Sequence, residues 1–349
     1  MSFFEGKTIL VTGGTGSIGS EVVRQLLQQK PKAIRILSRD EHKQYLFQQE
    51  LGPQAMPIVR YLLGDIRDYA RLVRALEGVD YVFHCAAYKH VPFCEYNSFE
   101  AVKTNVIGTQ NLVDAAIAQG VSRVLLISTD KAASPSNVMG ATKLLAEKMM
   151  TSAMHFAGAK PIRFASVRFG NVLASRGSVL PLFCRQIENG EPVTVTDPNM
   201  IRFFMSIPQA VSLMFRAMER MEGGELFILK MPVLRLGDMI DVLIEELAPR
   251  VGRDPKSIRR QTIGARPGEK MEEVLMTSEE SLYAIEENDM FIVHPPILLE
   301  DGKWSAAPKH APIKNGGTMH AQLLSKEQIR SLLSSVLSEY FNRKRAVTA

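Results

Sequence analysis

The chain contains few cysteines and lacks any long apolar run. Cys85, Cys94 and Cys184 are scattered, and no Cys-x-x-Cys or Cys/His spacing brings them together. This pattern predicts free, buried thiols and neither a disulfide framework nor a metal site. An apolar stretch of about 18 residues, long enough to span a bilayer, is absent, and the first residues lead into a strand pattern without signal-peptide architecture. We therefore expect a cytoplasmic protein with no membrane segment.

No sign of charge dominates the sequence. Lysine and arginine number 42 against 37 acidic residues, which gives a net charge of +5, and the basic residues are dispersed among the acids. Dispersed charge argues against a nucleic-acid partner, whereas arginines spread over clefts suit phosphate-bearing small molecules. The length of 349 residues and the hydrophobic content of 46% predict one large two-lobed fold or two closely packed domains.

The first motif is a glycine-rich turn between a strand and a helix. Residues 7–12, KTILVT, form a short apolar run, GGTGSIG follows, and a helical pattern begins at Ser20. Glycines at this spacing let the backbone approach a pyrophosphate closely at a helix N-terminus, so the turn predicts a dinucleotide site. Its candidate residues here are Gly13, Thr15, Gly16, Ser17, Ile18 and Gly19.

The end of the second expected strand bears on the choice of dinucleotide. Residues 33–37 fit this strand, and Ser38, Arg39 and Asp40 follow it. An acidic side chain at this point would bind the ribose of NAD, whereas Arg39 is placed to meet the 2′-phosphate of NADP. We therefore predict NADP rather than NAD. In the alternative, Arg39 stacks on the adenine and Asp40 binds the ribose.

Strands and helices continue to alternate along the chain. Further strands are expected over residues 58–63, 81–85 and 123–127, with another ending at 168, and helices over 69–76, 101–118 and 138–156. This repetition predicts an α/β fold with a parallel, doubly wound sheet. Residues 1–170 would form the dinucleotide-binding domain, and a helix and a strand within 206–234 would return to it. Residues 171–205 and 235–349 would form a smaller substrate-binding lobe that ends in a helix near 326–340.

Small and acidic residues follow two of these strands. Asp65, with Ile66 beside it, is placed either to accept a hydrogen bond from the adenine amine or to cap the next helix. Ala86 and Ala87 are small enough to let the backbone lie against a cofactor. We expect all four residues to contact the dinucleotide.

Three polar residues lie near the same expected site. Lys89 is placed to touch the cofactor and substrate phosphate or sugar hydroxyls, and His90 either contacts a ligand or belongs to a structural turn. Asn105 falls in the middle of a helix, where asparagine is a poor helix former. That position predicts a packing or hydrogen-bonding role beside the cofactor, such as holding the backbone of strand 123–127.

The stretch 128–143, STDKAASPSNVMGATK, collects the reactive side chains. It starts where the apolar run 123–127 ends, which is where chemistry usually lies in a doubly wound sheet. Thr129, Asp130 and Lys131 supply a hydroxyl, an acid and an amine. Met139 and Lys143 are one turn apart on the next helix and share a face. In the alternative, Asp130 and Lys131 form a plain surface ion pair.

Together with TGGTGSIG, CAAYKHVP, TNVIGT, RFGNV and ARPGEK, this stretch resembles the extended short-chain dehydrogenase/reductases. More narrowly, the chain looks like the UDP-N-acetylglucosamine 4,6-dehydratases of bacterial glycan synthesis, and the resemblance covers nearly its whole length. It implies a Rossmann-type domain with a smaller C-terminal lobe. One departure is important: Met139 occupies the position of the superfamily's tyrosine, as in the large membrane-anchored members of this branch, and methionine cannot exchange protons.

The resemblance implies an NADP-dependent dehydratase that acts on a UDP-sugar. Hydride leaves C4, water is lost across C5 and C6, and the hydride returns to C6. By analogy, Asp130 protonates the leaving C6 oxygen and Lys131 takes the C5 proton, for which Lys131 must be neutral part of the time. Thr129 would hydrogen-bond the C4 hydroxyl, and Lys143 would hold the nicotinamide ribose. With Met139 in place, the C4 proton would leave through Thr129 and a water or through Asp130.

The resemblance also suggests where the substrate binds. Arg202 and Arg266 would meet the diphosphate, and Asn171 a phosphate or sugar oxygen. Each candidate could instead form an ion pair between the lobes or a helix cap. The substrate-binding candidates are Lys89, Asn171, Arg176, Ser178, Arg202, Arg266 and Glu269.

Two other functions and two further questions stay open at this point. A nucleotide-sugar 4-epimerase would need the same fold and cofactor but no acid and base for C5 and C6, and it would ordinarily keep the tyrosine. An inactive NADP-binding sensor is the other alternative.

Resemblance to the methionine-bearing branch favours retention of configuration at C5. We expect a homo-oligomer if helices 101–118 and 138–156 pair across a two-fold axis, although the fold itself could cover their apolar faces.

Overall fold

A computed structural model describes residues 2–296 and 322–348. The part of the expected substrate-binding lobe that falls in residues 297–321 therefore lies outside the described residues. Within the described ranges, every helix is too short or too polar to span a bilayer. The three cysteines are free; Cys94 and Cys184 are buried and Cys85 is half-buried.

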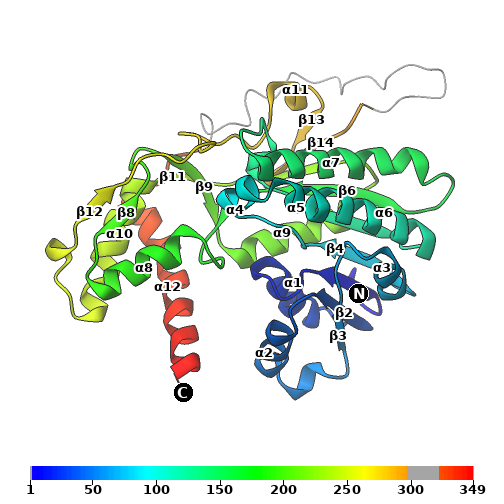
Figure 1. Ribbon diagram of the computed structural model, residues 1–349, viewed down its shortest axis with the longest axis horizontal. Helices are drawn as coiled ribbons and strands as arrows, with labels where there is room; N and C mark the ends of the chain where they lie inside the picture. Colours follow the sequence, from blue (N-terminus) through cyan, green and yellow to red (C-terminus); the bar gives the residue numbers. More distant parts are fainter. Residues whose placement is uncertain (1, 297–321, 349) are drawn as a thin grey trace.

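A nine-stranded sheet forms the centre of the larger lobe (Figure 1). Its order is β13-β14-β10-β6-β5-β4-β1-β2-β3, and all neighbours from β10 to β3 run parallel, which confirms the doubly wound sheet. The order reverses between β1 and β4, where ligands bind in such sheets. The strands are β1 (Thr8–Thr12), β2 (Ala33–Ser38), β3 (Val59–Leu63), β4 (Tyr81–His84), β5 (Arg123–Ile127), β6 (Arg163–Arg168), β10 (Leu226–Leu229), β13 (Ala284–Glu286) and β14 (Met290–Val293).

Helices cover both faces of this sheet. On one face α1 (Ser17–Leu27), α2 (Glu41–Leu51) and α9 (Ile207–Arg220) enclose one apolar core. On the other face α3 (Tyr69–Leu76), α6 (Gly108–Gln119) and α7 (Val138–Phe156) enclose a second. Because both faces are covered, the central strands are apolar along their length; all five residues of β1 are buried.

The smaller lobe has its own sheets and its own core (Figure 1). One sheet has the order β11-β9-β7 and the other pairs β12 with β8. Its strands are β7 (Asn171–Val172), β8 (Val193–Val195), β9 (Ile201–Met205), β11 (Val233–Arg235) and β12 (Arg260–Thr262). Three helices, α8 (Val179–Asn189), α10 (Leu236–Leu247) and α12 (Lys326–Thr348), pack around buried side chains such as Phe183, Leu243 and Leu333.

The structure alters one boundary of the expected lobes. Strands β13 and β14 lie within residues 235–349, which we assigned to the substrate-binding lobe, yet β14 pairs antiparallel with β10 of the large sheet. Its buried Met290 and Ile292 belong to the core of the larger lobe. The two-lobed division stays a proposal, with residues 284–293 assigned to the larger lobe.

The expected helix over residues 101–118 is more complex than its sequence pattern. It consists of α5 (Ser98–Val102), a π-helical turn over Lys103–Ile107 and then α6. Asn105 lies in the π turn, and such turns frequently mark functional positions. The remaining short elements are α4 (Val91–Tyr96), α11 (Ser278–Ser281) and 3-10 turns at Pro53–Ala55, Asp130–Ala132, Pro249–Val251 and Pro255–Ser257.

A buried arginine ties the chain's C-terminal part to the large sheet. Arg168, at the end of β6, is fully buried and contacts Glu147 of α7 at 2.6 Å and Glu280 of α11 at 2.9 Å. Its guanidinium also donates to the carbonyl of Leu275 at 2.8 Å. Since a buried guanidinium must have all its charge compensated, this contact fixes where residues 275–280 lie.

We expect Arg168→Ala to lower the free energy of unfolding by about 3–5 kcal/mol, because it leaves two buried carboxylates without their cation. Urea denaturation would measure the loss. In the control Arg250→Ala, the lost ion pair with Glu246 lies at the surface, and we expect a loss below about 1 kcal/mol. Equal losses in the two variants would contradict this account of Arg168.

Candidate active site

A cavity of about 770 Å³ opens at the carboxyl ends of β1, β4 and β5. Residues from the smaller lobe, including Asn171 and Arg176, form its opposite wall. The lining contains every residue expected to bind the cofactor except Asn105, namely Gly13, Thr15, Gly16, Ser17, Ile18, Gly19, Ser38, Arg39, Asp40, Asp65, Ile66, Ala86, Ala87, Lys89 and Lys143.

The glycine turn leaves no room for larger residues. Gly13 has φ +64°, and a Cβ atom there would lie 2.9 Å from the backbone of Ala86. A Cβ atom on Gly19 would lie 2.4 Å from the carbonyl oxygen of Gly13. The turn therefore packs tightly between the end of β4 and the start of α1, and its backbone is left exposed to the cavity.

At the adenosine end of the expected site, the acidic residues are already engaged. The side chain of Asp40 accepts from the backbone N–H of Lys43 and caps α2. Asp65 accepts from Arg67 at 2.7 Å and lies 3.5 Å from Arg39. Our alternative that Asp65 caps the next helix is wrong, because Asp68 caps α3. The guanidinium of Arg39 lies 5.3 Å from the ring centre of Tyr88 and lines the cavity.

Asn105 acts from behind the cavity wall. Its side chain accepts from the backbone N–H of Tyr88 at 2.8 Å and donates to the Tyr88 carbonyl at 3.0 Å. We expected it to hold strand 123–127, and the structure shows that it holds the loop after β4 instead. The reason is that the π turn places residue 105 opposite that loop.

His84, which the sequence patterns did not single out, fixes the same region from the core. Ala86 N–H donates to Thr12 Oγ1 at 3.3 Å, and Thr12 Oγ1 and His84 Nδ1 are 2.7 Å apart. On the other side Thr109 donates to the carbonyl of Asn105, so its oxygen accepts from His84 Nε2 at 3.1 Å. Burial lowers the pKa of His84 to about 3, and the neutral ring thus joins the ends of β1 and β4 to the π turn.

The loop over residues 174–178 packs against the cofactor side. Arg176 donates from its backbone to Ser17 at 2.9 Å and from its side chain to the carbonyl of Thr15, and its own carbonyl accepts from Lys89 at 2.7 Å. Burial, and to a lesser extent Arg176, lower the pKa of Lys89. His90 lines the cavity, and its ring lies where a side chain on residue 177 would be.

The three reactive residues after β5 form one hydrogen-bonded group. Asp130 is fully buried, and its Oδ1 accepts from Thr129 Oγ1 at 2.8 Å and from Lys131 Nζ at 3.0 Å. Thr129 and Lys131 line the cavity, whereas Asp130 lies behind them. The alternative of a surface ion pair is wrong, since the Asp130 side chain is 1% exposed.

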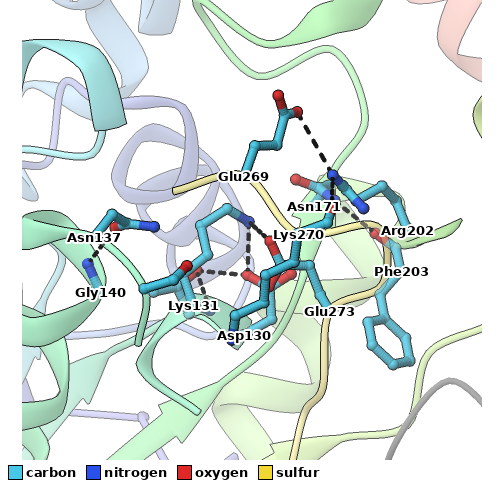
Figure 2. Close-up of polar contacts among 12 residues, drawn as sticks. Asp130, Lys131, Asn137, Gly140, Asn171, Arg202, Phe203, Glu269, Lys270 and Glu273 are labelled. Atoms are coloured by element: carbon cyan, nitrogen blue, oxygen red, sulfur yellow. Dashed lines mark hydrogen bonds and ion pairs between the residues drawn. The ribbon is translucent and has the colours of Figure 1, made fainter. Parts of the chain in front are cut away.

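A second carboxylate, missed by the sequence patterns, faces Lys131. Oε1 of Glu273 lies 3.7 Å from Lys131 Nζ, so this ammonium has a second carboxylate near it besides Asp130 (Figure 2). Burial lowers the pKa of Lys131, but Asp130 and Glu273 outweigh it and hold that pKa above its ordinary value. Glu273 lies four residues after Glu269 in ARPGEKMEEV, and no spacing in the sequence points to Lys131.

Met139 and Lys143 lie at the start of α7, beside the group. Met139 is 4% exposed and packs with Cys94 and Ala101. Lys143 donates to the carbonyl of Ile127 at 2.6 Å, and burial lowers its pKa to about 8. Gly140 allows the helix to approach, because a Cβ atom there would lie 2.3 Å from the carbonyl oxygen of Lys131.

The substrate candidates divide into two groups. Asn171, Arg176 and Ser178 line the cavity with Lys89, whereas Arg202, Arg266 and Glu269 are absent from the described lining. Arg202 is buried and donates to the carbonyls of Lys270 and Met271, and Glu269 lies 3.5 Å from it (Figure 2). Arg202 therefore forms its hydrogen bonds and ion pair inside the protein and does not lie at the cavity surface.

The fold and this site agree with the comparisons to known proteins. The family described as "Polysaccharide biosynthesis protein" matches residues 9–295. The chain belongs to this family. It is thus an extended short-chain dehydrogenase/reductase of the nucleotide-sugar dehydratase and epimerase type.

Several relatives are similar over most of their length. An uncharacterised membrane protein of Methanocaldococcus jannaschii is 51% identical, over 96% of this chain and 97% of that protein. A UDP-N-acetylglucosamine 4,6-dehydratase (inverting) of Campylobacter jejuni is 41% identical, over 85% and 86%. A UDP-glucose 4-epimerase of Rickettsia canadensis is 40% identical, over 82% and 83%. Among solved structures, Pen from Bacillus thuringiensis is 47% identical with a TM-score of 0.87, over 95% of this chain and 98% of Pen.

We expect Gly19→Ala to weaken binding of the nicotinamide dinucleotide at least about tenfold, because the added methyl group displaces the carbonyl of Gly13 from the turn. Isothermal titration calorimetry would measure the dissociation constant, and circular dichroism would confirm folding. The control is Gly120→Ala, which strains a φ of +69° at the end of α6 but meets nothing within 4 Å. An unchanged dissociation constant in folded Gly19→Ala would rule out the turn as the cofactor site.

Proposed function

We propose that this chain is an NADP-dependent 4,6-dehydratase that converts UDP-N-acetylglucosamine into a UDP-4-keto-6-deoxy sugar. The observation that carries the proposal is the pair of Asp130 and Lys131, whose Oδ1 and Nζ atoms are 3.0 Å apart at the end of β5. Elimination across C5 and C6 needs one group that takes a proton and another that gives one. A 4-epimerase needs neither group at those carbons.

The cavity suits a nicotinamide dinucleotide. Gly13 and Gly19 lack the Cβ atoms that would otherwise fill the glycine turn. Lys143 also lines the cavity. The choice of NADP is supported by Arg39 and Lys43, which both line the cavity, and by Asp40, whose carboxylate is occupied as a helix cap. When bound, the nicotinamide supplies the acceptor for the C4 hydride and returns that hydride to C6.

Thr129 connects the cavity to Asp130 and thereby replaces the missing tyrosine. As the Thr129 oxygen takes the proton of the C4 hydroxyl, its own proton passes to Asp130 Oδ1, which lies 2.8 Å away. The second oxygen, Oδ2, is buried and has no hydrogen-bond partner among the described residues. Met139 contributes only apolar packing at this point.

The elimination then uses the two groups together. The C5–H bond breaks, its proton goes to Lys131 Nζ, and its electron pair forms the C5=C6 bond. The C6–O bond breaks, and the oxygen leaves as water with the proton from Asp130, relayed through Thr129. Lys131 later returns its proton to C5. Asp130 has already given its proton to the leaving water and can accept the C4 proton of the next substrate.

The protonation state of free Lys131 adds a requirement. The structure shows an ion pair, in which Lys131 is charged and cannot take a proton. Lys131 must therefore lose one proton before turnover begins, and activity should rise with pH until Lys131 is neutral in the complex.

We expect Asp130→Asn and Lys131→Ala each to lower kcat by about 10²- to 10⁴-fold, because each removes a proton-transfer group. Purified protein would be given UDP-N-acetylglucosamine in deuterated water and followed by NMR. The wild type should form a C6 methyl group and carry deuterium at C5, since the Lys131 ammonium exchanges with solvent. Asp114→Asn, on the exposed face of α6, is the matched control and should turn over normally.

Other results would overturn this proposal. A change of configuration at C4 alone would identify an epimerase, and an absence of turnover with intact NADP⁺ binding would identify a sensor. If neither single variant slows a dehydratase reaction, the roles of Asp130 and Lys131 are wrong. Met139→Tyr completes the set: an unchanged rate is expected if Thr129 already carries the C4 proton.

A further inference from the structure

We propose that Glu273 is a positioning residue of the elimination step. Its carboxylate is the fixed counter-charge of Lys131, and it stabilises the ammonium that forms when Lys131 takes the C5 proton. This inference rests on the proposed function, since it concerns the protonation of Lys131 during the dehydratase reaction.

The geometry places Glu273 against Lys131. Its side chain is 5% exposed, and its Oε1 lies 3.7 Å from Lys131 Nζ. Within the described part of the chain, Lys131 is its ion-pair partner and no second one is found. Figure 2 shows the Lys131 ammonium paired with both carboxylates, those of Asp130 and Glu273.

Asp130 cannot serve as a permanent counter-charge because it carries protons in the reaction. During oxidation it gains the C4 proton and becomes neutral, and it loses that proton only as water leaves. In the same step Lys131 becomes charged. Glu273 lies outside the described lining of the cavity, and the proposed reaction passes no proton through it.

Two buried arginines hold the backbone on either side of Glu273. Before it, Arg202 donates to the carbonyls of Lys270 and Met271 at 2.7 and 2.9 Å. After it, Arg168 donates to the carbonyl of Leu275 at 2.8 Å. Both arginines are at least nine-tenths buried. A residue that acts through a second side chain must be held in a fixed position. The two arginines meet this requirement by fixing the backbone on both sides of Glu273.

The charges around Lys131 favour its ammonium. Asp130 and Glu273 raise its pKa, while burial and the more distant Arg202 lower it. Loss of the Glu273 charge should therefore make neutral Lys131 more abundant at a given pH, yet make it a weaker base. These two effects leave a signature that simple loss of packing does not produce.

Competitive acetylation of Lys131 at a series of pH values, read by mass spectrometry, tests the inference. In Glu273→Gln we expect the pKa of Lys131 to fall by about 1 to 3 units, from Coulomb's law at this separation. The rising limb of the kcat profile should shift to lower pH and its plateau should fall by about 10- to 100-fold, with KM changed less than about twofold.

Two further variants complete the design. Glu273→Asp keeps the charge and should recover much of the pKa and of the plateau. Glu279→Gln, at an exposed position in the nearby helix α11, should match the wild type. Thermal melts of all variants would establish that each is folded at the assay temperature.

The outcomes separate this inference from the proposed function. If the wild type forms no 4-keto-6-deoxy product, the proposed function fails, while acetylation still reports whether Glu273 controls the pKa of Lys131. If the wild type turns over and Glu273→Gln keeps the same Lys131 pKa and pH profile, the inference is overturned. A fall in kcat without either shift would also overturn it, because that result describes a structural role.

Discussion

The buried charge of Arg168 is the constraint on which the site depends. A guanidinium removed from water at the end of β6 requires carboxylates in fixed positions, and it takes one from α7 and one from α11. The same side chain binds the carbonyl of Leu275. This bond fixes the end of the segment that brings Glu273 within 3.7 Å of Lys131. Together with Arg202, Arg168 thus fixes the segment that lies beside the loop after β5.

Local patterns in the sequence were sufficient for the parallel strands of the sheet and for the glycine turn beside the cavity, but not for β13 and β14. The glycine turn, the strand ends and the small residues after β4 act within a few positions of one another, so their spacing along the chain carries their geometry. Asp40 and Asp65 show the limit of such patterns. Both lie where expected, but their partners, a helix N-terminus and Arg67, depend on backbone detail that the residue types do not specify.

The contacts that the sequence did not predict join distant parts of the chain. Arg168 and Leu275 are 107 residues apart, and Arg202 and Lys270 are 68 apart. The resemblance suggested Arg202 as a ligand for phosphate, whereas in the structure it binds backbone carbonyls next to Glu273. Glu273 itself is one of two adjacent glutamates, and only the folded chain distinguishes it from its exposed neighbour Glu272. For Asn105 the sequence left packing and hydrogen bonding open, and its hydrogen-bond partner, the backbone of Tyr88, depends on a π turn.

The absence of a tyrosine becomes intelligible when the protons of the proposed reaction are followed. The proton removed at C4 passes through Thr129 to Asp130 and leaves with the C6 oxygen, while the proton removed at C5 stays on Lys131 until it returns. Neither path needs a group at residue 139. Lys143, which would accompany such a tyrosine, instead binds the carbonyl of Ile127, directly before Ser128 and Thr129. Its contact with the protein thus supports the start of the loop that carries Thr129, Asp130 and Lys131.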